Sequence, residues 1–201
     1  MNKIKKPLLF TLAFLPIAVV AGYFVVMYQL ALFDQAILNE IISKVGSQKI
    51  IILVAVLQTI IYACVCAFFG YILSEKIGLM KSLRFKKASV VRTLIISVPV
   101  GVLFSLDFWI FGRLIPGTGV KDAAMAGMTG YGWLASILYG GIVEELMMRL
   151  FLMSLIAWLL WKLFYRNNDK APENVLIMAN VVAALLFAAG HLPIPLQYLM
   201  G

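Results

Sequence analysis

Five long apolar stretches limit what this chain of 201 residues can fold into. They lie at residues 8–33, 50–73, 93–111, 133–163 and 174–190. A membrane-crossing helix needs about 20 mainly apolar residues, and continuous rather than alternating apolar runs favour helices over a β-barrel. Hydrophobic residues make up 63% of the chain and charged residues only 13%, which excludes an ordinary soluble domain. We therefore expect an all-α, polytopic transmembrane helix bundle with about five membrane helices, forming a single membrane-embedded domain over residues 1–201.

The net charge of +8 carries information about membrane topology. In a soluble protein it would suggest nucleic acid, but here the basic residues gather in three segments, namely the N-terminus, residues 74–92 and residues 162–173. Cytoplasmic loops carry the excess of Lys and Arg, so all three segments are expected in the cytoplasm. We predict an integral membrane protein with a cytoplasmic N-terminus, contact with anionic lipid of the bilayer, and no nucleic-acid partner.

Three further features of the sequence have simple structural interpretations. Residues 34–48 form a short amphipathic segment that lies at the membrane interface or continues the first helix. Cys64 and Cys66 point to different sides of a helix, and we interpret them as two small buried residues without a disulfide. Asp107 lies inside the third apolar stretch, near its end, where it can reach the interface or Arg113.

A charged segment interrupts the fourth apolar stretch, where Glu144, Glu145 and Arg149 lie close together. One charge at membrane depth costs roughly 2.5–3.5 kcal/mol on insertion scales, so the group needs partners. On an α-helix Glu145 and Arg149 are i,i+4 neighbours in the favourable order, which predicts an ion pair. The pattern indicates one structural carboxylate and one working carboxylate, Glu144, although charges that only fix helix packing are an alternative. Glu144 falls on a row of small residues that would let another helix approach closely: Gly132, Ser136 and Gly140.

His191 is the one histidine of the chain and ends the fifth apolar stretch. The fourth and fifth helices are expected to be antiparallel, with Glu144 and His191 each eighteen residues from the polar loop 162–173. At about 1.5 Å per residue, both lie at one membrane depth. A carboxylate and an imidazole in a dry pocket can bind and activate water, whereas a structural histidine is the alternative. Three residues share the helical stripe of His191: Asn180, Ala184 and Phe187.

These residues resemble two motifs of the CPBP intramembrane metalloprotease family, also called Abi. It includes type II CAAX prenyl endopeptidases and bacterial proteins linked to bacteriocin processing or immunity. The motif Glu-Glu-x-x-x-Arg matches Glu144, Glu145 and Arg149, and the motif Phe-x-x-x-His matches Phe187 and His191. The resemblance implies a bacterial plasma-membrane endopeptidase in which Glu144 activates the attacking water and His191 binds water, binds metal or stabilises an oxyanion. It also implies supporting or substrate-binding roles for Glu145 and Arg149, and a divalent, zinc-like metal at Glu144 and His191.

The resemblance covers about residues 130–195, and the family's third motif, a second histidine followed four residues later by Asn or Asp, does not occur in the chain. Two explanations stay open: a C-terminally incomplete member, or a short member that acts by binding a membrane partner, as in bacteriocin immunity or regulation. The charge pattern places Glu144 at middle to outer depth, which favours a peptide or membrane-protein substrate over a prenylated cytosolic one. A transporter using Glu144, Glu145 and Asp107 is a third class, but no repeated halves support it.

Overall fold

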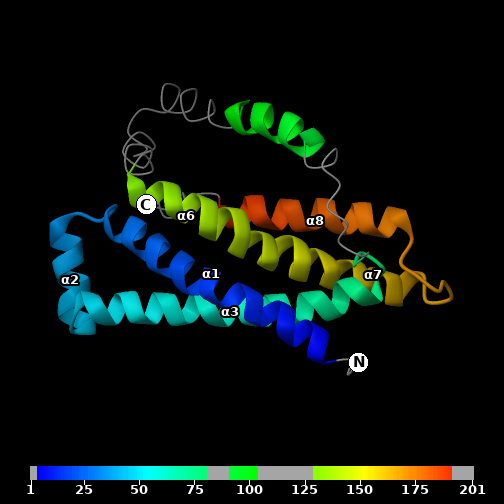
Figure 1. The fold of residues 1–201 in the computed structure, drawn as a ribbon, viewed down its shortest axis with the longest axis horizontal. Coiled ribbons are helices and arrows are strands. Elements are labelled where there is room, and N and C mark those ends of the chain that lie inside the picture. Colours follow the sequence, from blue (N-terminus) through cyan, green and yellow to red (C-terminus); the bar gives the residue numbers. More distant parts are fainter. Residues whose placement is uncertain (1–3, 81–90, 104–128, 192–201) are drawn as a thin grey trace, which may run out of the picture.

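The computed structural model describes residues 4–80, 91–103 and 129–191, and every regular element in these ranges is helical, which confirms the all-α prediction. Figure 1 shows an elongated bundle in which one long helix is built from α6, two π-helical segments (η1 and η2) and α7. In chain order the elements are α1 (Lys5–Leu30), α2 (Gln35–Val45), α3 (Gln48–Lys76), the helix Val91–Leu103, α6 (Gly130–Ala135), η1 (Ser136–Val143), η2 (Leu146–Met153), α7 (Ser154–Phe164) and α8 (Glu173–His191).

Four of these helices are long and apolar enough to cross a membrane: α1, α3, the helix Gly130–Phe164 and Glu173–Gly190 of α8. They correspond to four of the five predicted spans. The long helix starts before Trp133, its predicted first residue, because Thr129 caps it: the Thr129 Oγ1 accepts a hydrogen bond from the Gly132 N–H at 3.2 Å. Ser47 caps α3 in the same way, with its Oγ accepting from the Ile50 N–H at 3.4 Å.

The directions of the long helices require a further crossing. Phe24 of α1 contacts Tyr131 of α6, with ring centroids 6.1 Å apart, whereas the end of α3 packs on α7 and α8 through Ile77. The helix α3 and the helix Gly130–Phe164 therefore run in the same direction, as Figure 1 shows. The chain must return to the other end of the bundle between them. This agrees with a fifth crossing, and the helix Val91–Leu103 lies within that part of the chain.

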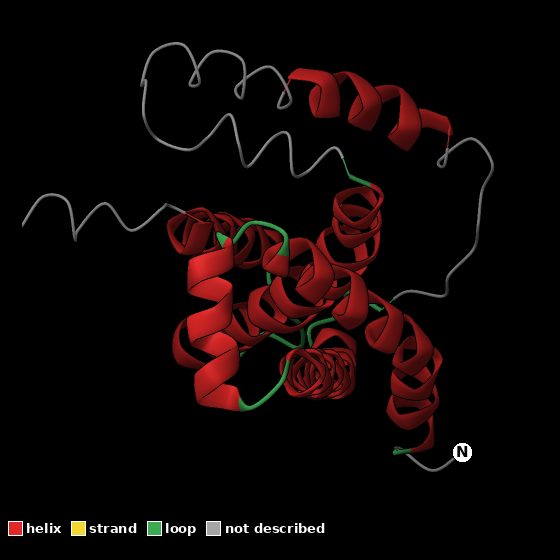
Figure 2. Ribbon diagram, turned by 90° about the vertical axis from the view of Figure 1, so that its left-hand side faces the viewer, coloured by secondary structure: helices red, strands yellow, loops and turns green. Residues whose placement is uncertain are grey.

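The helix Val91–Leu103 is exposed along its whole length and lies apart from the other helices when the molecule is seen end-on (Figure 2). It covers only the first part of the predicted third span, residues 93–111, and the rest of that span, Asp107 included, lies outside the described residues. The amphipathic segment 34–48 is a separate helix, α2, that lies across the end of the bundle instead of continuing α1. Within α2 no residue is buried.

Small residues bring α1, α3 and η2 together. A Cβ atom built on Gly22 of α1 would lie 3.0 Å from the Thr59 Cβ of α3, and one on Gly70 would lie 2.9 Å from the Leu150 backbone oxygen of η2. Without side chains at these points, the helix backbones pack directly, as is common between membrane helices. The adjoining core consists of Ala18, Ala21, Ala63 and Val143.

The end of α3 and the α7–α8 hairpin share a second core, made of Ile77, Ala157, Trp161, Val175 and Ala179. Two hydrogen bonds join the hairpin's ends: the Trp161 Nε1–H donates to the Asn168 carbonyl at 3.1 Å, and the Asn174 Nδ2 donates to the Tyr165 hydroxyl at 3.1 Å. These contacts fix how α8 lies along η2, and they thereby position the face of α8 that meets the acidic segment.

Candidate active site

The acidic pair lies between two π-helical segments, because Glu144 and Glu145 alone separate η1 from η2. In a π-helix each backbone N–H bonds to the carbonyl five residues earlier, and such turns occur often at functional sites. At the end of η1 the Glu144 N–H donates to the Tyr139 carbonyl. The prediction of a continuous helix through this region is confirmed, but its side-chain register differs from that of an α-helix.

Glu145 and Arg149 form the predicted ion pair. The Arg149 Nε donates to the Glu145 Oε2 at 2.9 Å. About half of the Glu145 side chain (51%) and most of the Arg149 side chain (70%) are not covered by the protein. A charged side chain at membrane depth that is not buried in protein needs water or a bound molecule beside it. The Glu145–Arg149 pair therefore borders a site that water or a bound molecule can enter.

Glu144 faces α8 across a cavity of about 150 Å³, called here the Asn180 cavity. On the acidic helix its wall includes Gly140, Glu144, Glu145 and Arg149. On α8 it includes the predicted stripe of Asn180, Ala184 and Phe187, so the face expected to meet Glu144 does meet it. The Glu144 side chain is half-buried, which leaves it accessible to a molecule in the cavity.

A second cavity of about 180 Å³, called here the Tyr139 cavity, adjoins Glu144 on the side toward the end of α8. Tyr139 and Glu144 line it from the acidic helix, and Phe187 and Gly190 line it from α8. Across its two cavities Glu144 faces residues 180–190 of α8, and Phe187 lines both of them. His191 is the last residue of α8, and its side chain lies outside the described residues.

Of the small-residue row predicted beneath Glu144, Gly132 is buried, but Ser136 and Gly140 do not bring another helix close. Ser136 is exposed, and a Cβ built on Gly140 would have only one described neighbour within 4 Å, the Glu144 Oε2 at 3.8 Å. The prediction is wrong at Gly140 because the π-helical turns change which residues share a face. Close approach occurs instead on the other side of the helix, where Leu150 meets Gly70. Gly140 has a different effect, which is to leave space for the Glu144 carboxylate.

The ion pair also borders a third and larger cavity, with a volume of about 520 Å³. This cavity lies between α1, the end of α3 and η2, and Glu145 and Arg149 line both it and the Asn180 cavity. Its other walls are mostly apolar, including Phe10, Phe14 and Leu146. The Glu145–Arg149 pair thus separates an apolar chamber from the chamber that holds Glu144.

The described residues do not fit a hydrolytic zinc site. Among them, no three His, Cys, Asp or Glu side chains gather where they could hold a metal ion. Glu145 is bound to Arg149, whereas a hydrolytic zinc takes three protein ligands and an open position. The zinc-like metal at Glu144 and His191 stays a prediction, and we derive no step through it.

Comparison with known proteins identifies the segment that carries this geometry. Residues 127–201 match the family model described as Type II CAAX prenyl endopeptidase Rce1-like. The predicted resemblance is confirmed. No curated protein and no solved structure matches the chain.

The matched segment, residues 127–201, begins just before α6 and includes all of η1, η2, α7 and α8. Both walls of the Asn180 and Tyr139 cavities belong to it, so the family match and the cavity geometry select the same part of the molecule. The sequence alone did not indicate Tyr139 as a site residue. It lies five residues before Glu144, and on an α-helix residues five apart do not share a face.

Proposed function

We propose that this chain is an intramembrane endopeptidase in which Glu144 activates water against a peptide bond. The observation that carries the proposal is the place of Glu144 between two cavities that α8 lines, within the segment that matches a CAAX endopeptidase family. A half-buried carboxylate beside a space large enough for water and a peptide backbone has the geometry of a general base.

The proposed reaction uses this carboxylate twice. Glu144 takes a proton from a water molecule as the water oxygen attacks the peptide carbonyl carbon, and the carbonyl oxygen becomes an oxyanion. The carbon–nitrogen bond then breaks, and the leaving nitrogen takes the proton from Glu144. We propose that His191, at the end of α8, orients the water or stabilises the oxyanion, and that the Glu145–Arg149 pair supports the site and borders the substrate.

The proposed substrate is a peptide or membrane-protein segment, because the Glu145–Arg149 pair opens onto an apolar chamber of about 520 Å³ that would accept apolar side chains. We further propose a bacterial plasma-membrane location with the N-terminus in the cytoplasm. The N-terminal segment and the α7–α8 loop, both basic, lie at one end of the bundle and α2 lies at the other (Figure 1), as the positive-inside rule requires of cytoplasmic segments.

The test is cleavage of membrane peptides by the purified 201-residue protein in lipid nanodiscs. We expect cleavage by the wild type and a loss of about 10²–10⁴-fold in kcat for Glu144→Gln, the contribution typical of a general base. His191→Ala should also lose activity. Glu173→Gln, which alters an exposed carboxylate at the start of α8, is the matched control and should retain it.

A protein that binds a membrane partner without hydrolysis is the second candidate. It is favoured by the sequence, which contains one histidine and lacks the third motif, a second histidine followed four residues later by Asn or Asp. A folded wild type that cleaves no peptide of a broad membrane-peptide library would contradict the endopeptidase and leave this candidate in place.

A further inference from the structure

The π-helical turn places Tyr139 beside Glu144. In an α-helix residues five apart point about 140° away from each other, but in a π-helical turn the two ends of the i→i+5 hydrogen bond lie one above the other. The Glu144 N–H donates to the Tyr139 carbonyl in this way. The two residues therefore occupy the same side of the helix, and both line the Tyr139 cavity.

The Tyr139 side chain packs on the core of the bundle and also lines the cavity of Glu144. The ring is half-buried and packs on the core made of Ala18, Ala21, Ala63 and Val143. Tyr139 lines the same cavity as Glu144 and interacts electrostatically with Glu144 and with Tyr62 of α3. Packing of the ring on two other helices limits the positions that the hydroxyl can take.

A polar pair on α3, formed by Gln58 and Tyr62, interacts electrostatically with Tyr139 through Tyr62. The Gln58 Nε2 donates to the Tyr62 hydroxyl oxygen at 2.7 Å, which leaves the Tyr62 O–H itself to act as a donor. Polar side chains within a membrane span are costly and usually mark function. Gln58 and Tyr62 are joined by this hydrogen bond on α3, and Tyr139 lines the cavity that contains Glu144.

We propose that the Tyr139 hydroxyl is a catalytic hydrogen-bond donor, which binds the peptide carbonyl oxygen and stabilises the oxyanion that forms when the water held by Glu144 attacks. The phenol stays neutral and keeps its proton throughout, so the proton balance of the hydrolysis is unchanged. Packing of the Tyr139 ring on α1 and α3 holds the phenol in position. The proposal rests on the endopeptidase function and assigns it a residue outside both sequence motifs.

The experiment compares Tyr139→Phe with Tyr131→Phe in nanodiscs. Both changes remove one hydroxyl and keep the ring. Tyr131 lies on the same long helix and packs on Phe24, but it lines none of the cavities around Glu144. Loss of an oxyanion donor lowers kcat by about 10²–10³-fold. We expect that loss for Tyr139→Phe with KM changed less than about threefold, and wild-type values for Tyr131→Phe. Thermal unfolding of both variants should match the wild type.

The outcomes separate the two proposals. Cleavage by the wild type with unchanged kcat in Tyr139→Phe would overturn the role of Tyr139 and leave the endopeptidase standing. A fall in kcat accompanied by an equal fall in the unfolding midpoint would also overturn it, in favour of a packing role. If wild type cleaves nothing, the endopeptidase fails and the Tyr139 role fails with it. The ¹⁹F resonance of 3-fluorotyrosine at position 139, expected to move on Glu144→Gln, tests their proximity without any cleavage.

Discussion

At the scale of single residues, two adjacent carboxylates have different surroundings. Glu145 is bound by Arg149 at 2.9 Å, whereas Glu144 borders two cavities that α8 lines. The first arrangement follows from i,i+4 spacing alone. The second depends on the π-helical segments and on how α8 packs. The sequence could therefore predict that the two carboxylates differ, but not which residues surround Glu144.

The Glu145–Arg149 pair should show strong energetic coupling. Glu145→Gln and Arg149→Gln each leave one charge at membrane depth without its partner, and the double variant leaves none, so it should recover part of the lost stability. We expect a coupling free energy on the order of 1 kcal/mol from a double-mutant cycle of unfolding in detergent.

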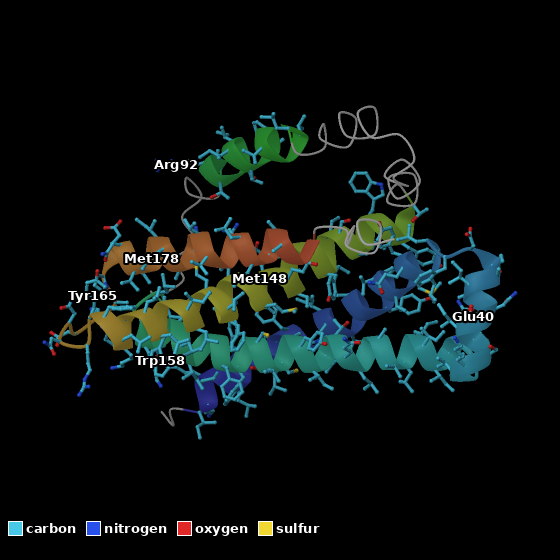
Figure 3. The ribbon with its side chains drawn as sticks, turned by 180° about the vertical axis from the view of Figure 1, so that it is seen from behind. Glu40, Arg92, Met148, Trp158, Tyr165 and Met178 are labelled. Carbon is cyan, nitrogen blue, oxygen red and sulfur yellow. The ribbon has the colours of Figure 1, made fainter. Side chains whose placement is uncertain are left out.

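The Glu40–Lys44 pair of α2 is the matched control for this cycle. It has the same i,i+4 spacing and a 2.6 Å contact, but it lies at the end of the bundle opposite Tyr165 (Figure 3). A water-exposed pair contributes about 0.3–0.5 kcal/mol. Equal coupling in the two cycles would show that Glu145 and Arg149 are as well hydrated as a surface pair.

Gly140 should be sensitive to side-chain size. An alanine Cβ would lie 3.8 Å from the Glu144 Oε2, an ordinary contact, whereas a leucine side chain would extend into the Asn180 cavity. We therefore expect Gly140→Ala to retain peptide cleavage and Gly140→Leu to lose most of it, with both variants folded by size-exclusion chromatography. Full activity in Gly140→Leu would mean that the Asn180 cavity is not used.

At the scale of elements, close backbone packing holds the acidic helix against α3. The contact at Gly70 and Leu150 lies on the opposite side of the helix from the Asn180 cavity. Packing on one side and cavities on the other leave the carboxylate of Glu144 accessible while η2 is held in place. The sequence does not reveal this division, because small residues occur on several rows of the helix.

Substitution of Gly70 should weaken the α3–η2 contact. In Gly70→Ala the new Cβ would lie 2.9 Å from the Leu150 backbone oxygen, so the helices must move apart. We expect a loss of about 1–3 kcal/mol, the usual cost of overpacking, seen as a lower midpoint of thermal unfolding in detergent.

Gly101→Ala is the control for this effect, since no described atom lies within 4 Å of its Cβ position. Alanine has the higher helix propensity, so this variant should unfold at the wild-type temperature or above. A similar loss of stability in both variants would contradict the packing explanation.

At the scale of the whole molecule, the two ends of the bundle should face opposite sides of the membrane. Figure 3 shows Tyr165 and Glu40 at opposite ends, and the basic N-terminal segment lies at the Tyr165 end. In a protein without Cys64 and Cys66, Lys44→Cys should react with an impermeant maleimide in intact cells. Lys170→Cys should react only after lysis. The reverse pattern would contradict the predicted orientation, and labelling of both positions from one side would contradict the odd number of crossings between them.

The sequence by itself determined the features that depend on local periodicity. Apolar length predicted five membrane spans, and four of them are long apolar helices in the described residues. The i,i+4 spacing predicted the Glu145–Arg149 pair, and the stripe Asn180, Ala184, Phe187 predicted the face of α8 that meets Glu144. Each of these follows from the regular repeat of an α-helix, which can be counted along the chain.

Only the tertiary structure decided which residues surround Glu144. The π-helical turns depart from the α-helical repeat, so they place Tyr139 beside Glu144 and leave Gly140 facing a cavity instead of another helix. The close contact of Gly70 with Leu150 likewise joins residues far apart in the sequence. Such contacts depend on how the surfaces of several helices fit together with little empty space. The sequence of one helix does not determine that fit.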